Sequence, residues 1–169
     1  MLAVTFTVLI LLTGLAIVFV LGMRTKAPVV LGPLFWMSKR YMNPAQLRTA
    51  GRPGADASII RARGRRTGMI HATPVGAVAI EDGFLIALPY GSKAQWLRNV
   101  LAAGEAELVS EGASYRVDRP ELIPLRDVVR HFSPTDRRLF RLLATTDCLR
   151  LHRASVLEPR IPLAEAVAA

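Results

Sequence analysis

The chain has 169 residues, 51% of them hydrophobic, and carries a formal net charge of +9 with a pI near 11.0. This charge favours anionic partners such as lipid headgroups or a multiply charged small molecule. No zinc-finger, helix-turn-helix or RNP-like pattern accompanies it, so we expect no nucleic-acid partner. The single cysteine, Cys148, excludes an internal disulfide framework and lies in an apolar run typical of a buried thiol.

Residues 1–23 contain no charged side chain and consist mostly of Leu, Val, Ile, Phe and Ala. This length is sufficient for one transmembrane helix. A cleaved export signal is the alternative, although such signals usually carry positive charge before the apolar segment, whereas Arg24 and Lys26 follow it here. By the positive-inside tendency, the pattern predicts a single-pass protein of the cell membrane with its soluble domain in the cytoplasm.

Residues 24–56 are predicted to form a juxtamembrane segment. Within it, 33–42 places Trp36 and Tyr41 beside basic residues, which favours a short helix lying either at the membrane surface or against the domain. The prolines and glycines of 43–57 predict a loop.

Residues 57–158 show the patterns of a small β domain, and 159–169 a weakly ordered tail. Pro74 within an apolar run predicts an edge strand or a bulge, and Asp82-Gly83 predicts a hairpin turn. Gly104 ends one predicted helix, and Ser133 caps another. The predicted strands are 57–63, 69–80, 84–89, 107–110, 114–119 and 148–152, and the predicted helices are 93–103, 124–132 and 134–145. This order predicts a mainly β protein with helices (α+β), in which a small antiparallel barrel carries helices on its outside.

The most basic stretch lies between the first two predicted strands. Four arginines crowd this turn, and Thr67 and Gly68 close it. Guanidinium groups this close repel one another and are suited to bind phosphate or carboxylate, although a solvated turn is the alternative. A second loop, residues 90–92, leads into the helix that carries Trp96 and Asn99, and would add an aromatic plane and an amide. Together these features favour a flat, polyanionic ligand. The four arginines are Arg61, Arg63, Arg65 and Arg66.

Several short motifs in this order resemble the deazaflavin-dependent nitroreductase family of high-GC actinobacteria, over about residues 57–155. The motifs are Gly64-Arg65-Arg66-Thr67-Gly68, Thr73-Pro74, Asp82-Gly83, Pro89-Tyr90-Gly91, Trp96 with Arg98 and Asn99, and Ala102-Ala103-Gly104. The resemblance implies a split β-barrel of the FMN-binding-like type that uses coenzyme F420, a deazaflavin.

The resemblance also implies the residues of a coenzyme site. The anionic tail would be bound by Arg65, Arg66, Thr67 and Gly68. The ring would lie among Thr73, Pro74, Tyr90, Gly91, Ser92, Trp96 and Asn99. A hydroxyl of Tyr90 or Ser92 is the candidate catalytic group, because it could stabilise charge that develops on the acceptor. Two features depart from the family's quinone and nitro reductase branch: Gly76 stands where a pocket tyrosine is expected, and no tyrosine follows Tyr115.

The sequence therefore predicts a membrane-anchored oxidoreductase that transfers a hydride from the reduced deazaflavin coenzyme to an electron-poor, lipophilic acceptor of quinone or nitro type. Two alternatives stay open: an FMN-binding oxidoreductase on the same fold, and a non-catalytic module that binds coenzyme or lipid at the membrane. The expected partners are the bilayer and a small lipophilic acceptor, and the oligomeric state stays open. The three histidines have no metal-ligand spacing, so no metal site is predicted.

Overall fold

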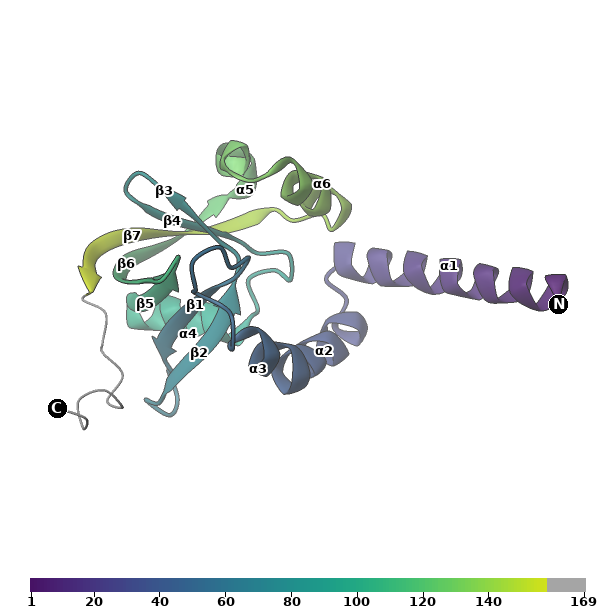
Figure 1. The fold of residues 1–169 in the computed structure, drawn as a ribbon, viewed down its shortest axis with the longest axis horizontal. Helices are drawn as coiled ribbons and strands as arrows, with labels where there is room; N and C mark the ends of the chain where they lie inside the picture. The colour runs from purple at the N-terminus through teal and green to yellow at the C-terminus, as the bar shows by residue number, and fades with distance from the viewer. Residues whose placement is uncertain (158–169) are drawn as a thin grey trace.

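The computed structural model describes residues 1–157, and the predicted tail lies outside them. Helix α1 (Leu2–Arg24) extends away from the rest of the chain (Figure 1). Most of its described apolar side chains are exposed, for example Leu11 at 67%, whereas Met23 near its C-terminal end is buried. From Val4 to Arg24 it is long and apolar enough to cross a bilayer by length and composition, a test that an export signal also passes. The predicted apolar helix is confirmed.

The chain reverses at Lys26, which has a φ of +54°, and enters a second helical stretch. This stretch contains α2 (Pro28–Met37), a π-helical turn (Ser38–Met42) and α3 (Asn43–Gln46). The predicted helix over 33–42 was too short, because the helical stretch runs from Pro28 to Gln46. The loop predicted over 43–57 therefore begins only after residue 46. The reason is that Pro28 stands at the first residue of α2 and Pro44 in the first turn of α3, where a proline interrupts no helical hydrogen bond.

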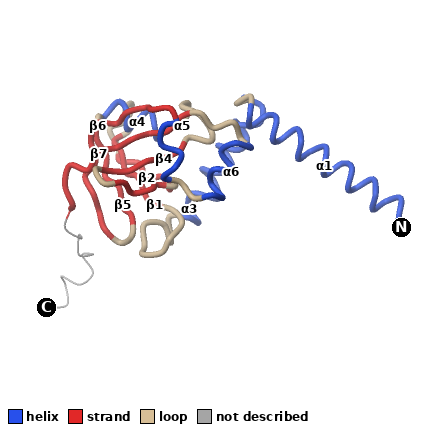
Figure 2. The backbone as a smooth tube through the Cα atoms, turned by 90° about the horizontal axis from the view of Figure 1, so that it is seen from above, coloured by secondary structure: helices blue, strands red, loops and turns tan. Residues whose placement is uncertain are grey.

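Seven antiparallel strands form one sheet in the order β2-β1-β5-β6-β7-β4-β3. Edge strands β2 and β3 are consecutive in the chain and are separated only by Gly76, so the sheet curls until its two edges meet at that residue (Figures 1 and 2). The result is a split barrel, which confirms the predicted fold class. The strands are β1 (Ser58–Arg63), β2 (Ile70–Val75), β3 (Ala77–Ile80), β4 (Gly83–Ala87), β5 (Glu105–Ser110), β6 (Ala113–Pro124) and β7 (Asp147–Leu157).

Some predicted boundaries in the sheet were wrong. The run 69–80 is two strands, because the chain leaves one edge of the sheet and enters the other at Gly76. Strand β6 continues to Pro124, which shortens the predicted helix over 124–132 to α5 (Leu125–Val128) and a 3-10 turn (Val129–His131). Strand β7 is longer than predicted, because it pairs with β4 only over 148–152, whereas its pairing with β6 extends from Asp147 to Leu157. Pro74 lies in edge strand β2, as predicted.

The two faces of the sheet are covered by different helices. Successive side chains of β4 point to opposite faces and therefore belong to two different cores. Phe84 and Ile86 point into the main core, which α4 (Gln95–Ala103) completes with Leu97 and Val100. Leu85 points into a second core, which includes Phe132 and Phe140 and lies beneath α5 and α6 (Pro134–Leu142). Cys148 belongs to this second core and is fully buried, as predicted.

Two predicted helix ends are confirmed by their capping contacts. Helix α4 ends at Gly104, whose left-handed backbone has a φ of +72°. At the start of α6, the Ser133 Oγ accepts a hydrogen bond of 3.1 Å from the backbone N–H of Asp136.

Candidate functional site

The basic turn between β1 and β2 is closed by its own backbone. The Gly64 N–H donates to the Met69 carbonyl at 2.7 Å, and the Gly68 N–H donates to the Gly64 carbonyl at 2.8 Å. Gly68 adopts a φ of +69°, which other residues rarely adopt. A Cβ on Gly64 would lie 2.9 Å from the His71 ring and from the Thr67 hydroxyl oxygen, so a larger residue here would displace these two side chains.

Arg65 fixes this turn to helix α4. Its backbone N–H and its Nη1 donate to the Asn99 Oδ1 at 3.3 and 3.0 Å, and its Nη2 donates to the Gln95 Oε1 at 2.9 Å. Asn99 is only 8% exposed. Sequence reasoning placed Arg65 and Asn99 on different parts of a ligand, whereas the structure brings them together and pairs their polar atoms with each other. Arg61 is likewise engaged, with Glu107 at 2.7 Å.

Arg66, Thr67 and Gly68 form the exposed part of the turn. Within residues 1–157, Arg66 has no hydrogen bond or ion pair. The Thr67 Oγ1 accepts a weak hydrogen bond of 3.4 Å from the Met69 N–H, which leaves its own O–H as a donor. These residues therefore offer a guanidinium group and a hydroxyl group for an anion.

The residues predicted around the ring lie on β2 and α4. Thr73 and Pro74 are half-buried and face Ile60 and Ile59 of β1 in the strand register. Trp96 is half-buried against the main core, so part of its ring serves packing and part stays accessible. The position expected to carry a pocket tyrosine is Gly76, where a Cβ would have open space.

The loop that carries Tyr90, Gly91 and Ser92 is bound to the end of α1. The Lys26 Nζ donates to the carbonyls of Pro89 at 2.6 Å and of Leu143 at 3.1 Å. Burial lowers the pKa of Lys26, and the nearby Asp147 carboxylate partly opposes this shift. Tyr90 is 39% exposed, Ser92 is exposed, and Gly91 has a φ of +76°. Sequence reasoning used Lys26 only as a topology signal and missed this contact, since the contact joins residues 63 positions apart.

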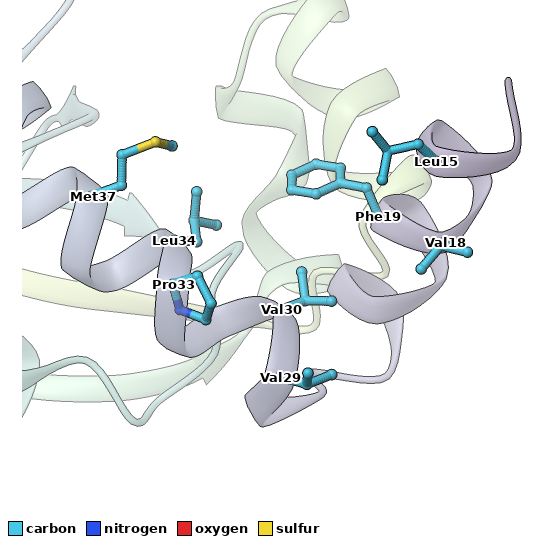
Figure 3. A pocket seen from close by; sticks show the side chains of 8 residues that line it. All are labelled: Leu15, Val18, Phe19, Val29, Val30, Pro33, Leu34 and Met37. Atoms are coloured by element: carbon cyan, nitrogen blue, oxygen red, sulfur yellow. The ribbon is translucent and has the colours of Figure 1, made fainter. Parts of the chain in front are cut away.

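An apolar cavity of about 280 Å³ lies between α1 and α2 (Figure 3). Phe19 and Leu15 face it from α1, and Val30, Leu34 and Met37 from α2. The predicted coenzyme residues do not line it. Because it is built only of hydrocarbon side chains and one thioether, the cavity suits an apolar chain and offers nothing to an anion.

No family model matches the chain, and no curated protein does. Similar solved structures include an F420 reductase, with 10% identity over 66% of this chain and 95% of that chain, and a TM-score of 0.47. A conserved hypothetical protein from Mycobacterium tuberculosis has 10% identity over 61% of this chain and 76% of that chain, with a TM-score of 0.47. A proposed 5-nitroimidazole antibiotic resistance protein from Bacteroides thetaiotaomicron has 13% identity over 69% and 81%, with a TM-score of 0.44.

Proposed function

We propose that this chain is a membrane-anchored oxidoreductase that transfers a hydride from the reduced deazaflavin coenzyme F420 to an electron-poor, lipophilic acceptor of quinone or nitro type. The observation that carries the proposal is the meeting of two loops at the first turn of α4. Arg65 binds the basic turn to Gln95, the first residue of that helix, and the loop of Tyr90 and Ser92 leads directly into it. The sequence resemblance implies a coenzyme site made of these same loops.

The donor groups of this region fit a polyanionic coenzyme. Arg66 and Thr67 would hold the anionic tail, and the accessible part of Trp96 would lie against the ring beside Thr73 and Pro74. When bound, the reduced coenzyme supplies the hydride. The hydroxyls of Tyr90 and Ser92 would donate hydrogen bonds to the acceptor and stabilise the negative charge that develops on it.

The exposed apolar surface of α1 and the basic residues at its end support the proposed membrane anchoring. Burial of that surface in a bilayer removes it from water, and Arg24 and Lys26 then lie at the level of the cytoplasmic headgroups. The cavity between α1 and α2 (Figure 3) would accept the apolar chain of a lipophilic acceptor directly from the bilayer. The segment that joins α1 to α2 contains Lys26, which donates to the Pro89 carbonyl next to Tyr90.

A fluorescence titration of the full-length protein in neutral detergent tests the coenzyme site. We expect Arg66→Gln to weaken binding of the deazaflavin coenzyme at least about tenfold, equivalent to about 1.4 kcal/mol, because a charged group that contacts the tail is lost. Arg52→Gln is the matched control, since Arg52 is also exposed but belongs to the turn that bonds to Gly112, near the opposite end of β1. Equal affinity of the Arg66→Gln and Arg52→Gln variants would contradict the tail-binding role.

Two further outcomes separate the rival functions. Tighter binding of FMN than of the deazaflavin would keep the fold and replace the coenzyme. Tight binding of reduced deazaflavin without its oxidation by any quinone or nitro acceptor would contradict the enzyme and identify a coenzyme-binding module instead.

A further inference from the structure

A groove of about 640 Å³ lies between α5 and α6, on the face of the sheet opposite α4. Leu125 and Phe140 of the second core contribute apolar wall to it. Four arginines line it: Arg126, Arg137, Arg138 and Arg141. None of the residues of the candidate coenzyme site takes part, so this groove is a second basic region of the molecule.

Most of this positive charge is uncompensated. Asp127 contacts Arg126 at 3.5 Å, and Asp136 accepts a hydrogen bond of 2.7 Å from the Ser133 hydroxyl. Within the part of the chain that the structure describes, no carboxylate forms an ion pair with Arg137, Arg138 or Arg141. Three guanidinium groups on one helix and without counter-ions repel one another, and a bound anion would relieve this repulsion.

Thr145 adds an independent indication of a ligand. Thr145 is one of the residues that line the groove, and its Oγ1 is shielded from solvent and has no hydrogen-bond partner among the described residues. Buried hydroxyl groups almost always find a partner, and a hydroxyl without one marks a place where an acceptor is missing. Because Thr145 itself lines the groove, its O–H would donate to an oxygen atom there once the side chain turns toward the groove.

The groove lies next to the end of the apolar helix. The Arg24 Nη1 donates to the carbonyls of Arg141 and Leu142 at 3.1 and 3.0 Å, and both views show α6 beside that end of α1 (Figures 1 and 2). Leu139 and Leu142 of α6 are 44% and 50% exposed beside the arginines. If α1 spans the bilayer, as the proposed function requires, α6 lies at headgroup level, where exposed leucines and arginines on one helix are favourable.

We infer that this groove binds the phosphate group of an anionic phospholipid in the leaflet that faces the barrel. Arg137, Arg138 and Arg141 pair with the phosphate oxygens, and the Thr145 hydroxyl donates to one of them. Leu139 and Leu142 contact the start of the acyl chains. The bound lipid would then fix α6, and with it the barrel, against the membrane.

Isothermal titration of the full-length protein in neutral detergent tests this inference. The probes are short-chain phosphatidylglycerol, short-chain phosphatidylcholine and inorganic phosphate. We expect phosphatidylglycerol to bind at least tenfold more tightly than the other two. Absence of phosphatidylglycerol binding overturns the inference, and equal affinity for inorganic phosphate overturns its lipid part in favour of a soluble anion.

Two variants locate the binding site in the groove. Arg137→Gln combined with Arg141→Gln is expected to weaken phosphatidylglycerol binding at least tenfold, whereas Arg130→Gln, an exposed arginine of the same segment outside the groove, is expected to leave it unchanged. Thr145→Val preserves the shape of the side chain and should weaken lipid binding several-fold. Unchanged lipid affinity in the double variant or in Thr145→Val overturns the inference.

The melting temperature provides a readout that a merely structural role of Thr145 would change. Without lipid, Thr145→Val should melt at the same temperature as the parent protein or higher, because the hydroxyl has no protein partner to lose. A lower melting temperature overturns its role as a ligand donor. If the double arginine variant does not fold, the Thr145→Val variant and the comparison of the three probes still test whether the groove binds phospholipid. The lipid titration contains no coenzyme, so absence of lipid binding would contradict this inference without bearing on the proposed coenzyme site.

Discussion

Helix α1 and the barrel use the same apolar residue types and treat them in opposite ways. Leu11 of α1 is 67% exposed, whereas Leu108 of β5 is fully buried between α4 and the other strands of the main core. Most apolar side chains of the barrel are covered by neighbouring strands or helices, whereas α1 contacts the rest of the protein at one end only, through α2 and Leu143. The comparison shows that apolar side chains of the same type tend to leave water in both regions. Whether such a side chain is buried inside the protein or is left to another apolar medium depends on the neighbouring elements that pack against it.

Where the barrel meets the end of α1, polar contacts join them. Arg24 and Lys26 together donate to four carbonyls, those of Arg141, Leu142, Leu143 and Pro89. Three of these carbonyls lie at the end of α6, where cations are favoured by the helix dipole. Met23 of α1 also packs with Leu31 of α2 and with Leu143 in a small apolar cluster. The junction therefore transmits the position of the apolar helix to the barrel through polar and apolar contacts together.

The largest expected effect is a difference in stability between two leucine variants, one in the barrel core and one in α1. Leu108→Ala should lower the free energy of unfolding of the barrel by about 2–5 kcal/mol, because it leaves a cavity in a packed core. Leu11→Ala should leave the unfolding of the barrel unchanged, because its side chain contacts no part of the barrel core. Urea denaturation of both full-length variants in detergent, followed by circular dichroism, measures the difference. Equal losses in both variants would show that α1 packs against the protein.

A smaller effect is expected at the junction. Lys26→Met should lower the free energy of unfolding by about 1 kcal/mol, because two charge-assisted hydrogen bonds are lost while the cost of burying the ammonium group disappears. Hydrogen exchange of amides 88–92 should become faster in this variant. Lys93→Met is the matched control, since Lys93 is exposed on the same loop. If exchange in both variants equals that of the parent, Lys26 does not hold the loop.

The smallest effect concerns reactivity alone. Burial raises the pKa of the Cys148 thiol to about 12, so the thiol should stay protonated and resist iodoacetamide at pH 8 in the folded protein. Mass spectrometry before and after addition of urea measures the labelling, which is unambiguous because Cys148 is the only cysteine. Labelling of the folded protein at the rate of the unfolded one would contradict the burial of this side chain.

The same shift in pKa predicts how the stability of the protein changes at alkaline pH. Between the ordinary thiol pKa of 9.0 and about 12, the unfolded chain releases a proton that the folded chain retains, so the contribution of Cys148 to stability falls as pH rises through this window. Lys26 acts in the opposite direction, because its pKa is lowered in the folded state and its buried charge is relieved as pH rises.

Local features of the fold were predictable because their causes are local. The cap at Ser133, the stop at Gly104 and the hairpin between β3 and β4 depend on neighbours within a few residues. The turn residues of that hairpin are Glu81 and Asp82, and the predicted turn residue Gly83 already pairs with Ile80 as the first residue of β4. The break at Gly76 was not predictable from its neighbours, because it is set by closure of the whole sheet.

The candidate site was predictable in its residue types but not in its contacts. The motif placed Arg65 in a basic turn, yet its partner Asn99 is 34 positions away and meets it only after α4 packs on the barrel. The groove between α5 and α6 was missed for a similar reason. The sequence predicted a helix over 134–145 and gave its arginines no role, whereas the groove also requires residues of α5.

The place of β7 in the sheet has a consequence for how the protein is made. As the last strand in the described chain, β7 lies between β6 and β4 and is the only strand that joins the group β2-β1-β5-β6 to the pair β4-β3. During synthesis the ribosome delivers α1 first and β7 more than a hundred residues later. The chain is therefore expected to reach the membrane while the barrel is still two separate sheets with open edges, which leaves these edges exposed to unwanted pairing until translation is nearly complete.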